Sequence, residues 1–239
     1  MIKQEFLRLK ETLIFDELMA LKETRKHAIQ KSPIFDRKLK LTQDELGIVF
    51  GQYWHLLTYF PDFLAHLITS LPRLEDKSKI ARVLSEECGN GDLKEAHEGA
   101  YFEAMKMLGI SEESVRKSVP LPATQKMMNA YYACADEPMK GLGFFISTEF
   151  ADLWIVSNLG RLMLNALPKR QKVKWIDLHV TQEPGHVDDA TACLNWINDS
   201  KKLGSIVMNA HECSNLWDSF FIGLHNEIQS RRNNLKKLA

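Results

Sequence analysis

The sequence predicts an all-α protein, a single compact bundle of about seven or eight helices that spans residues 1–239 as one domain. Apolar residues recur at helical spacing along most of the chain, and no segment alternates with the two-residue period of a strand. No repeat or low-complexity linker divides the chain. Its 239 residues, 45% of them hydrophobic, are ample for one buried core.

The first part of the chain contains recognisable helix ends. A first helix is expected over Lys3 to Gln30, where a Ser-Pro pair ends it. Thr42, followed three residues later by Glu45, forms a capping box that predicts the start of a second helix. That helix runs through the letters GIVFGQYWHLLTYFPDFLAHLITSL. Because proline cannot donate a backbone hydrogen bond, Pro61 is expected to kink or divide it.

Further helices are expected over residues 75–87, 93–108, a short stretch after residue 111, 124–135, 140–166, 172–198 and 205–235. The glycine-rich letters CGNGD end the first of these, and Gly109 stands at the C-cap position of the next. Pro184 and Gly185 fall inside the helix over 172–198. Because proline removes a hydrogen bond and glycine loosens the backbone, we expect this helix to kink or unwind there.

Charge and cysteine usage exclude several classes of protein. Lys+Arg and Asp+Glu are both 31, so no basic surplus indicates nucleic-acid binding. No apolar run approaches the ~18 residues that span a bilayer, and the N-terminus lacks the apolar core of a signal peptide. The four cysteines form no CxxC pair, which favours reduced thiols. We therefore expect a cytoplasmic protein that binds neither nucleic acid nor a membrane.

Glu149 lies in the middle of a predicted core-facing stripe. Leu142, Val156 and Met163 stand at seven-residue multiples from it, so all four fall on one side of their helix. Because burying an unpaired charge is very costly, such a carboxyl is neutralised, paired or bound to a metal. Taken alone, the pattern favours a Glu paired with Arg or Lys, or hydrogen-bonded to Tyr or Trp.

The letters HVTQEPGH, residues 179–186, bring together three side chains of metal-ligand type. His179, Glu183 and His186 stand at i, i+4 and i+7, which is nearly one face of a helix. Two imidazoles and a carboxylate suit iron, manganese or zinc. The Glu-x-x-His spacing also resembles that of di-iron proteins built on helical bundles. A polar helix face with ordinary histidines is the alternative.

A third group of such residues surrounds the glycine-rich turn. Glu86 and Glu87 end one helix, and His97 follows early in the next, on its apolar side. The turn is expected to bring a glutamate and His97 to the same end of the bundle. A helix-terminal carboxylate pair beside a half-buried His explains the same pattern without a metal.

Taken in order, these motifs resemble a known family. The chain has Glu-x-Gly-x-Gly followed by a His, then an isolated core Glu, then His-x-x-x-Glu-x-x-His. This order resembles the haem-oxygenase-like di-iron oxidases and oxygenases, which include CADD-like proteins and iron-containing redox enzymes. The letters GQYWHLLTYFPDFLAHL are similar to that family's second core helix. The resemblance covers about Gln52 to His186 and implies a haem-oxygenase-like fold, which TenA-like and PqqC-like proteins share.

The resemblance implies a metal-dependent oxidoreductase that binds a pair of iron ions per chain and uses O2 to oxidise a small-molecule substrate. It assigns the iron ligands to Glu87, His97, Glu149, His179, Glu183 and His186. Glu86 is an alternative to Glu87. Asp189, one turn beyond the last histidine, is an alternative to Glu183. The resemblance and the long apolar helices also predict a homodimer.

Aromatic residues cluster on the second helix, where we expect substrate groups to bind. The expected pocket residues are Tyr53, His55, Tyr59 and Tyr101. Asp152, Asp188 and Tyr101 are candidates for hydrogen bonds that orient the ligating rings.

Two other functions stay open. A cofactorless TenA-like or PqqC-like enzyme would share the fold, and the TenA type needs a nucleophilic cysteine, for which Cys134 is the candidate. A non-enzymatic helical interaction protein with a vestigial metal site would take up no metal.

Overall fold

Every regular element of the computed structural model is a helix within the described residues, which are 2–169, 171–197 and 199–238, without the side chains of 2–11, 13, 14, 183 and 238. The α-helices are α1 (Ile2–Lys31), α2 (Gln43–Ser70), α3 (Leu74–Glu87), α4 (His97–Met107), α5 (Glu112–Arg116), α6 (Pro122–Ala135), α7 (Pro138–Ala166), α8 (Lys174–Ala192) and α9 (Ser200–Leu238). Two 3-10 turns, η1 (Pro33–Phe35) and η2 (Gly89–Gly91), complete them. The all-α prediction is confirmed, and the short α5 brings the α-helices of the described part to nine.

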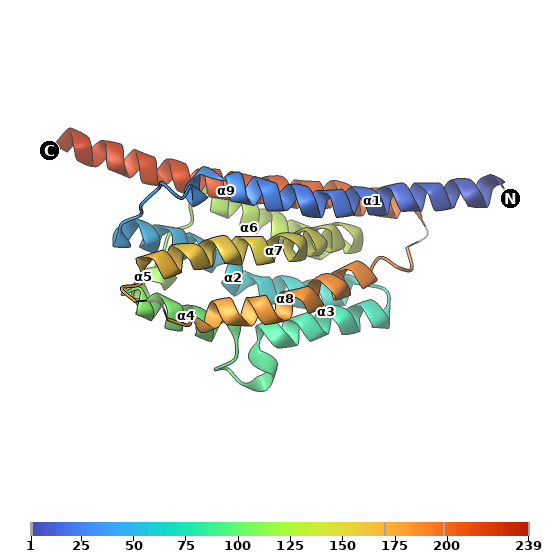
Figure 1. Cartoon of the computed structure of the whole chain (residues 1–239). Helices are drawn as coiled ribbons and strands as arrows, with labels where there is room; N and C mark the ends of the chain where they lie inside the picture. Colours follow the sequence, from blue (N-terminus) through green and yellow to red (C-terminus); the bar gives the residue numbers. More distant parts are fainter. Residues whose placement is uncertain (1, 170, 198, 239) are drawn as a thin grey trace.

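Helix α7 lies at the centre of the bundle. It packs against α1, α2, α6, α8 and α9, and nearly every residue in its first half is buried. Figure 1 shows α1 and α9 side by side along one side of the molecule, whereas α3 and α4 lie on the opposite side. The stretch of residues 141–151, which includes Glu149, is therefore buried on all sides, whereas later residues such as Ser157 reach the surface.

The start of α2 follows the predicted capping box. The Thr42 side chain accepts a hydrogen bond from the backbone of Glu45, and the Glu45 carboxylate accepts one from the backbone of Thr42. Pro61 does not divide this helix, which is continuous from Gln43–Ser70. Buried apolar side chains on both sides of the proline, such as Leu57 and Phe63, anchor both halves of the helix in the core.

Helix α8 is also continuous across its proline. The expected unwinding at Pro184 is wrong, because the described backbone is helical over Lys174–Ala192. Contacts with α3, α4 and α7 along its length hold the helix together where local propensity alone disfavours it. Two boundaries also differ: α8 ends several residues before the predicted 198, and α9 begins at Ser200 rather than at 205.

The connection between α3 and α4 is longer than predicted and contains a tight glycine turn. Gly89, Asn90 and Gly91 all have positive φ, at 78°, 52° and 91°, a conformation that glycine adopts without strain. A Cβ on Gly89 would also meet the backbone of Ala96. The chain reverses direction at this turn, and residues 92–96 continue without a helix before α4 begins at His97 instead of at residue 93.

Buried apolar side chains from Leu18 to Ile228 belong to one core cluster. A single domain over residues 1–239 is compatible with this cluster and stays a prediction. All four cysteines are free thiols, as predicted, and only Cys88 is exposed. Within the described residues, no helix combines the length and the apolar character that crossing a bilayer requires.

Candidate functional site

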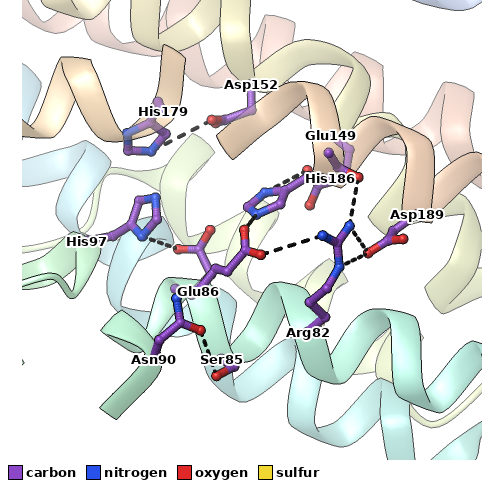
Figure 2. A network of polar contacts seen from close by, with 12 residues as sticks. Arg82, Ser85, Glu86, Asn90, His97, Glu149, Asp152, His179, His186 and Asp189 are labelled. Atoms are coloured by element: carbon purple, nitrogen blue, oxygen red, sulfur yellow. Dashed lines mark hydrogen bonds and ion pairs between the residues drawn. The ribbon is translucent and has the colours of Figure 1, made fainter. Parts of the chain in front are cut away.

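Ionisable side chains from four helices meet in the interior of the bundle (Figure 2). They are Glu86 and Glu87 at the end of α3, His97 at the start of α4, Glu149 and Asp152 on α7, and His179 and His186 on α8. Most of them are buried, and Glu149, His97, His179 and His186 are all at most 4% exposed. Burying so many titratable groups costs free energy, and such clusters are typical of functional sites.

Local structure explains why these side chains meet. His179 and His186 are seven residues apart, so about two turns of α8 place them on the same face. Asp152 follows Glu149 by three residues and shares its side of α7. The positive-φ turn after α3 brings the first residue of α4, His97, back to the glutamates that end α3.

His186 lies between two carboxylates. Its Nε2 is 2.9 Å from Oε2 of Glu86, and its Nδ1 is 3.4 Å from Oε2 of Glu149. Burial alone would lower the pKa of this imidazole. Hydrogen bonding and negative charge from Glu149, with smaller contributions from Glu87 and Glu86, outweigh burial and raise the pKa to about 9. Without a metal, His186 is therefore a buried imidazolium at neutral pH.

His97 and His179 behave in the opposite way. Burial lowers the pKa of both rings, that of His97 to about 4, so both are neutral at neutral pH. The rings meet edge to face with their centroids 4.5 Å apart. Nδ1 of His179 lies 2.7 Å from the carbonyl oxygen of Trp175 and therefore donates to it. This bond leaves the lone pair on Nε2, which is 3.8 Å from Oδ2 of Asp152.

Several buried polar atoms of the cluster make no hydrogen bond with the described residues. They include both ring nitrogens of His97 and Oε1 of Glu149. Burial, with the negative charges of Glu149 and Glu86, raises the pKa of Glu87 to about 8, and its Oε2 lies 3.5 Å from Nδ1 of His97. Because more than nine in ten buried polar groups are paired in native proteins, these atoms indicate a ligand position.

Neutral imidazoles and carboxylates are the donors that iron takes in helical bundles. Among the described residues, no group of three or more His, Cys, Asp or Glu side chains is already arranged to hold a metal ion. The side chain of Glu183, which was predicted as a ligand, lies outside the described residues. The donor set and its unpaired atoms therefore fit iron in chemical kind, and the rings of His97 and His179 are already in the neutral form that binds metal.

The structure separates the alternative ligands. Glu86 contacts His186 and belongs to the cluster. Asp189 instead pairs with Arg82, because the Nε atom of Arg82 lies 2.7 Å from Oδ2 of Asp189. The Asp189 carboxylate therefore faces α3, away from His97 and His179 (Figure 2). Of the residues expected to orient the rings, Asp152 is placed beside His179, whereas Asp188 is exposed.

A cavity reaches this cluster from the side of α2. Its lining includes Glu87, Glu149, Asp152 and His179, together with aromatic and apolar side chains. The latter are Tyr53, Leu56, Leu57, Tyr59 and Phe60 on α2, Tyr131 on α6 and Trp217 on α9, and Thr148 adds a hydroxyl from α7. Tyr53 and Tyr59 were predicted here. The residues from α6, α7 and α9 were missed, because no periodicity in the sequence relates them to α2.

Two predicted pocket residues are absent from the described lining. His55 follows Tyr53 by two residues, which turns its side chain roughly 200° around α2. The Tyr101 hydroxyl donates a hydrogen bond of 2.6 Å to the carbonyl of Phe50, and its ring is buried against Trp175. Tyr101 is thus a core residue that neither lines the cavity nor bonds to a histidine of the cluster.

The sequence pattern that describes iron-containing redox enzymes matches residues 48–218, which include the whole cluster. This chain belongs to that family. A search of curated proteins finds no significant sequence match to this member of the family.

Several solved structures share the fold of this family member. A CADD-like protein of unknown function from Nostoc punctiforme PCC 73102 has a TM-score of 0.75 at 13% identity, covering 90% of this chain and 97% of that one. A domain of unknown function with a heme oxygenase-like fold from Shewanella denitrificans OS217 has a TM-score of 0.72 at 16% identity, covering 90% and 92%. A TenA homolog from Pseudomonas syringae pv. tomato str. DC3000 has a TM-score of 0.71 at 13% identity, covering 88% and 92%. The predicted haem-oxygenase-like fold is confirmed.

Proposed function

We propose that this chain is a non-haem di-iron oxidase or oxygenase that activates O2 and oxidises a small organic substrate. The observation that carries the proposal is the buried histidine and carboxylate cluster at the end of a cavity, with both nitrogens of His97 and one oxygen of Glu149 unbonded among the described residues. Membership of the iron-containing redox enzyme family supports the choice of iron over manganese or zinc.

The proposed iron ligands are Glu87, His97, Glu149, His179, Glu183 and His186, with Glu86 as an alternative to Glu87. Bound ferrous iron would supply the electrons that reduce O2 and thereby generate the oxidant. The protein's own contribution is to hold the donors, to exclude water and to shape the space for substrate. Apolar and aromatic side chains of α2 and α9 line that space.

Neighbouring groups orient the proposed ligands. The carbonyl of Trp175 fixes the tautomer of His179 so that Nε2 is the available donor. Glu86 accepts a hydrogen bond from His186 and fixes the plane of that ring. His186 and Glu87 hold protons at neutral pH in the metal-free chain, since their pKa values are about 9 and about 8. Those protons must leave when the same atoms bind a metal.

The test is anaerobic loading of the purified metal-free protein with Fe(II), followed by a count of bound iron and by mixing with O2. We expect about two iron ions per chain and O2 consumption that depends on them. His97→Ala is expected to lose iron. The matched control is His211→Ala, because His211 is exposed and pairs only with Glu17 among the described residues. Equal iron uptake by both variants would remove His97 from the site.

The cofactorless TenA-like alternative has less support from the site. It needs a reactive thiolate, but Cys134 is not among the described residues that line the cavity. Burial also raises the pKa of its thiol far above the ordinary range, which disfavours the nucleophilic form. Hydrolysis of a thiamine analogue that iodoacetamide abolishes, without any iron uptake, would favour this alternative.

The non-enzymatic alternative has its own signature. An interaction protein with a vestigial site would bind no iron, and His179→Ala would leave its stability unchanged. Iron uptake by the parent, with a rise in melting temperature that His179→Ala removes, would exclude it.

A further inference from the structure

One cavity residue carries a hydroxyl that makes no hydrogen bond to the described part of the chain. Tyr59 lines the cavity and is only 4% exposed, yet its hydroxyl has no hydrogen-bond partner among the described residues. Two other hydroxyls of the lining, those of Tyr131 and Thr148, differ because they bond to each other at 2.5 Å. A buried hydroxyl without a partner costs free energy, and a bound ligand would remove that cost.

The ring of Tyr59 is held in place by its neighbour on α6. The centroids of Tyr59 and Tyr132 are 3.9 Å apart. Tyr132 is half exposed and does not line the cavity. Burial raises the pKa of Tyr59 well above its ordinary value, so its hydroxyl keeps its proton and can donate it to an acceptor.

The charge of the cavity wall restricts what can bind. The lining carries the carboxyl groups of Glu87, Glu149 and Asp152, and no Lys or Arg is among its described residues. In the metal-free chain, an anion entering this space would lose its hydration without meeting a Lys or Arg side chain among the described residues, which is unfavourable. The remaining wall is apolar or aromatic, including Leu56, Phe60 and Trp217, and so favours an apolar body.

We propose that the substrate is an uncharged, mainly apolar small molecule with a hydrogen-bond acceptor that the Tyr59 hydroxyl binds. This inference rests on the proposed function, since it takes the cavity as the place where substrate is oxidised. It goes further by assigning Tyr59 to substrate binding and by excluding carboxylate or phosphate substrates that rely on a protein cation.

The first experiment compares two probes of the same shape and different charge, 4-fluorobenzamide and 4-fluorobenzoate. Each is titrated into the full metal-free chain and followed by its fluorine NMR signal. Metal-free protein is used so that a carboxylate cannot gain affinity by binding iron. We expect the amide to bind at least about tenfold more tightly than the carboxylate. Equal or tighter binding of the carboxylate, or no binding of either probe, would overturn the proposal.

The second experiment removes single hydroxyls. Tyr59→Phe is expected to weaken binding of the amide about five- to tenfold, the effect of one hydrogen bond. Tyr132→Phe is the matched control, since it deletes the same group on the ring that contacts Tyr59 and should leave binding unchanged. Amide affinity in Tyr59→Phe equal to the parent's would remove Tyr59 from the binding site.

Iron uptake separates this inference from the proposed function. Tyr59 is not a proposed ligand, so Tyr59→Phe should bind as much iron as the parent. If the parent binds no iron, the di-iron function fails while the two probe experiments still decide the ligand class. If iron binds and the amide does not, only the assignment of Tyr59 and of the substrate class fails.

Discussion

Three histidines of one cluster differ in charge because of their immediate neighbours. His186 meets the carboxylates of Glu86 and Glu149 and holds a proton, whereas His97 and His179 meet each other and stay neutral. Burial acts on all three rings in the same direction. The difference therefore comes from which partner each ring contacts, and that is decided by side-chain packing.

The metal-free protein is expected to lose stability as the pH rises from about 6.5 to about 9. The pKa of His186 is raised from 6.5 to about 9 and that of Glu87 from 4.5 to about 8, so the folded state holds both protons more tightly than the unfolded state. Their contribution is therefore lost as pH increases. Below about pH 6.5 the lowered pKa of His97 opposes this trend. Melting temperatures at pH 6.5, 7.5 and 9 measure the effect.

The control for this pH dependence is a pair of isosteric variants. Glu87→Gln should flatten the decline between pH 6.5 and 8. Glu98→Gln, at an exposed carboxylate that pairs with Arg116, should leave it unchanged. A parent protein whose melting temperature rises over this range would contradict the assigned direction of both shifts.

Two tyrosines of the cavity should respond differently to loss of the hydroxyl. The Tyr131 hydroxyl contacts Thr148 at 2.5 Å, the Cys213 thiol at 3.4 Å and the Trp217 indole at 3.3 Å. Tyr131→Phe leaves these buried groups short of a partner and should cost about 1–3 kcal/mol. Tyr59→Phe removes an unpaired group and should leave stability equal or higher. Urea unfolding of both variants makes the comparison, and an equal loss in both would contradict it.

At the scale of elements, Arg82 ties α3 to the part of α8 that follows its proline. The guanidinium donates to the carboxylate of Asp189 at 2.7 Å and to the backbone carbonyl of Gly185 at 3.3 Å, and it lies 3.7 Å from Glu86 (Figure 2). Pro184 weakens the hydrogen bonding of α8 at this level. Arg82 supplies an external contact where the helix is locally weak, one turn from His186.

Loss of this contact should loosen the second half of α8. In Arg82→Ala we expect faster hydrogen exchange at amides after Pro184 and weaker iron binding, because His186 is then held less firmly. Arg116→Ala is the matched control, since Arg116 is similarly exposed and pairs with Glu98 and Glu112 away from α8. Unchanged exchange in α8 of Arg82→Ala would contradict this role.

Sequence signals that act over a few residues correctly predicted particular helix ends. The capping box at Thr42 and the glycine turn after Glu87 both appear in the structure. The unwinding expected at Pro184 was wrong, because contacts from three neighbouring helices outweigh the lost hydrogen bond. Of the aromatic residues in the cavity wall, only Tyr53 and Tyr59 on α2 were predicted. Side chains of Tyr131 and Trp217 come from helices whose packing no short-range pattern specifies.

At the scale of the whole molecule, the helical pattern was sufficient to predict the fold class. A stripe of apolar residues with one glutamate predicted that the middle of α7 is buried, and Glu149 is 2% exposed. The pairing of that carboxylate could not be predicted, since its partner His186 lies on another helix. The assignment of the six residues Glu87, His97, Glu149, His179, Glu183 and His186 to metal binding stays a prediction.

A homodimer is still expected, and one surface could form it. A groove between α7 and α8 includes Leu153, Leu164 and Val180, of which Val180 is 57% exposed. Exposed apolar surface of this kind often marks a contact between subunits.

Light scattering should give about twice the chain mass of 27.5 kDa. Val180→Glu should lower that mass, and Met208→Glu, at an equally exposed apolar residue on α9, should not. A mass of one chain for the parent would refute the dimer.

Glu86 and Glu87 are consecutive residues that face different histidines, one on α8 and one on α4. Neighbouring positions on a helix point about 100° apart, so a single peptide unit joins the two halves of the cluster. Any shift of the end of α3 that favours one glutamate's contact moves the other as well. If each half holds one iron ion, the two ions share this mechanical link, and filling the first position changes the affinity of the second. Cooperative binding of iron would then follow from the adjacency of Glu86 and Glu87 in the sequence.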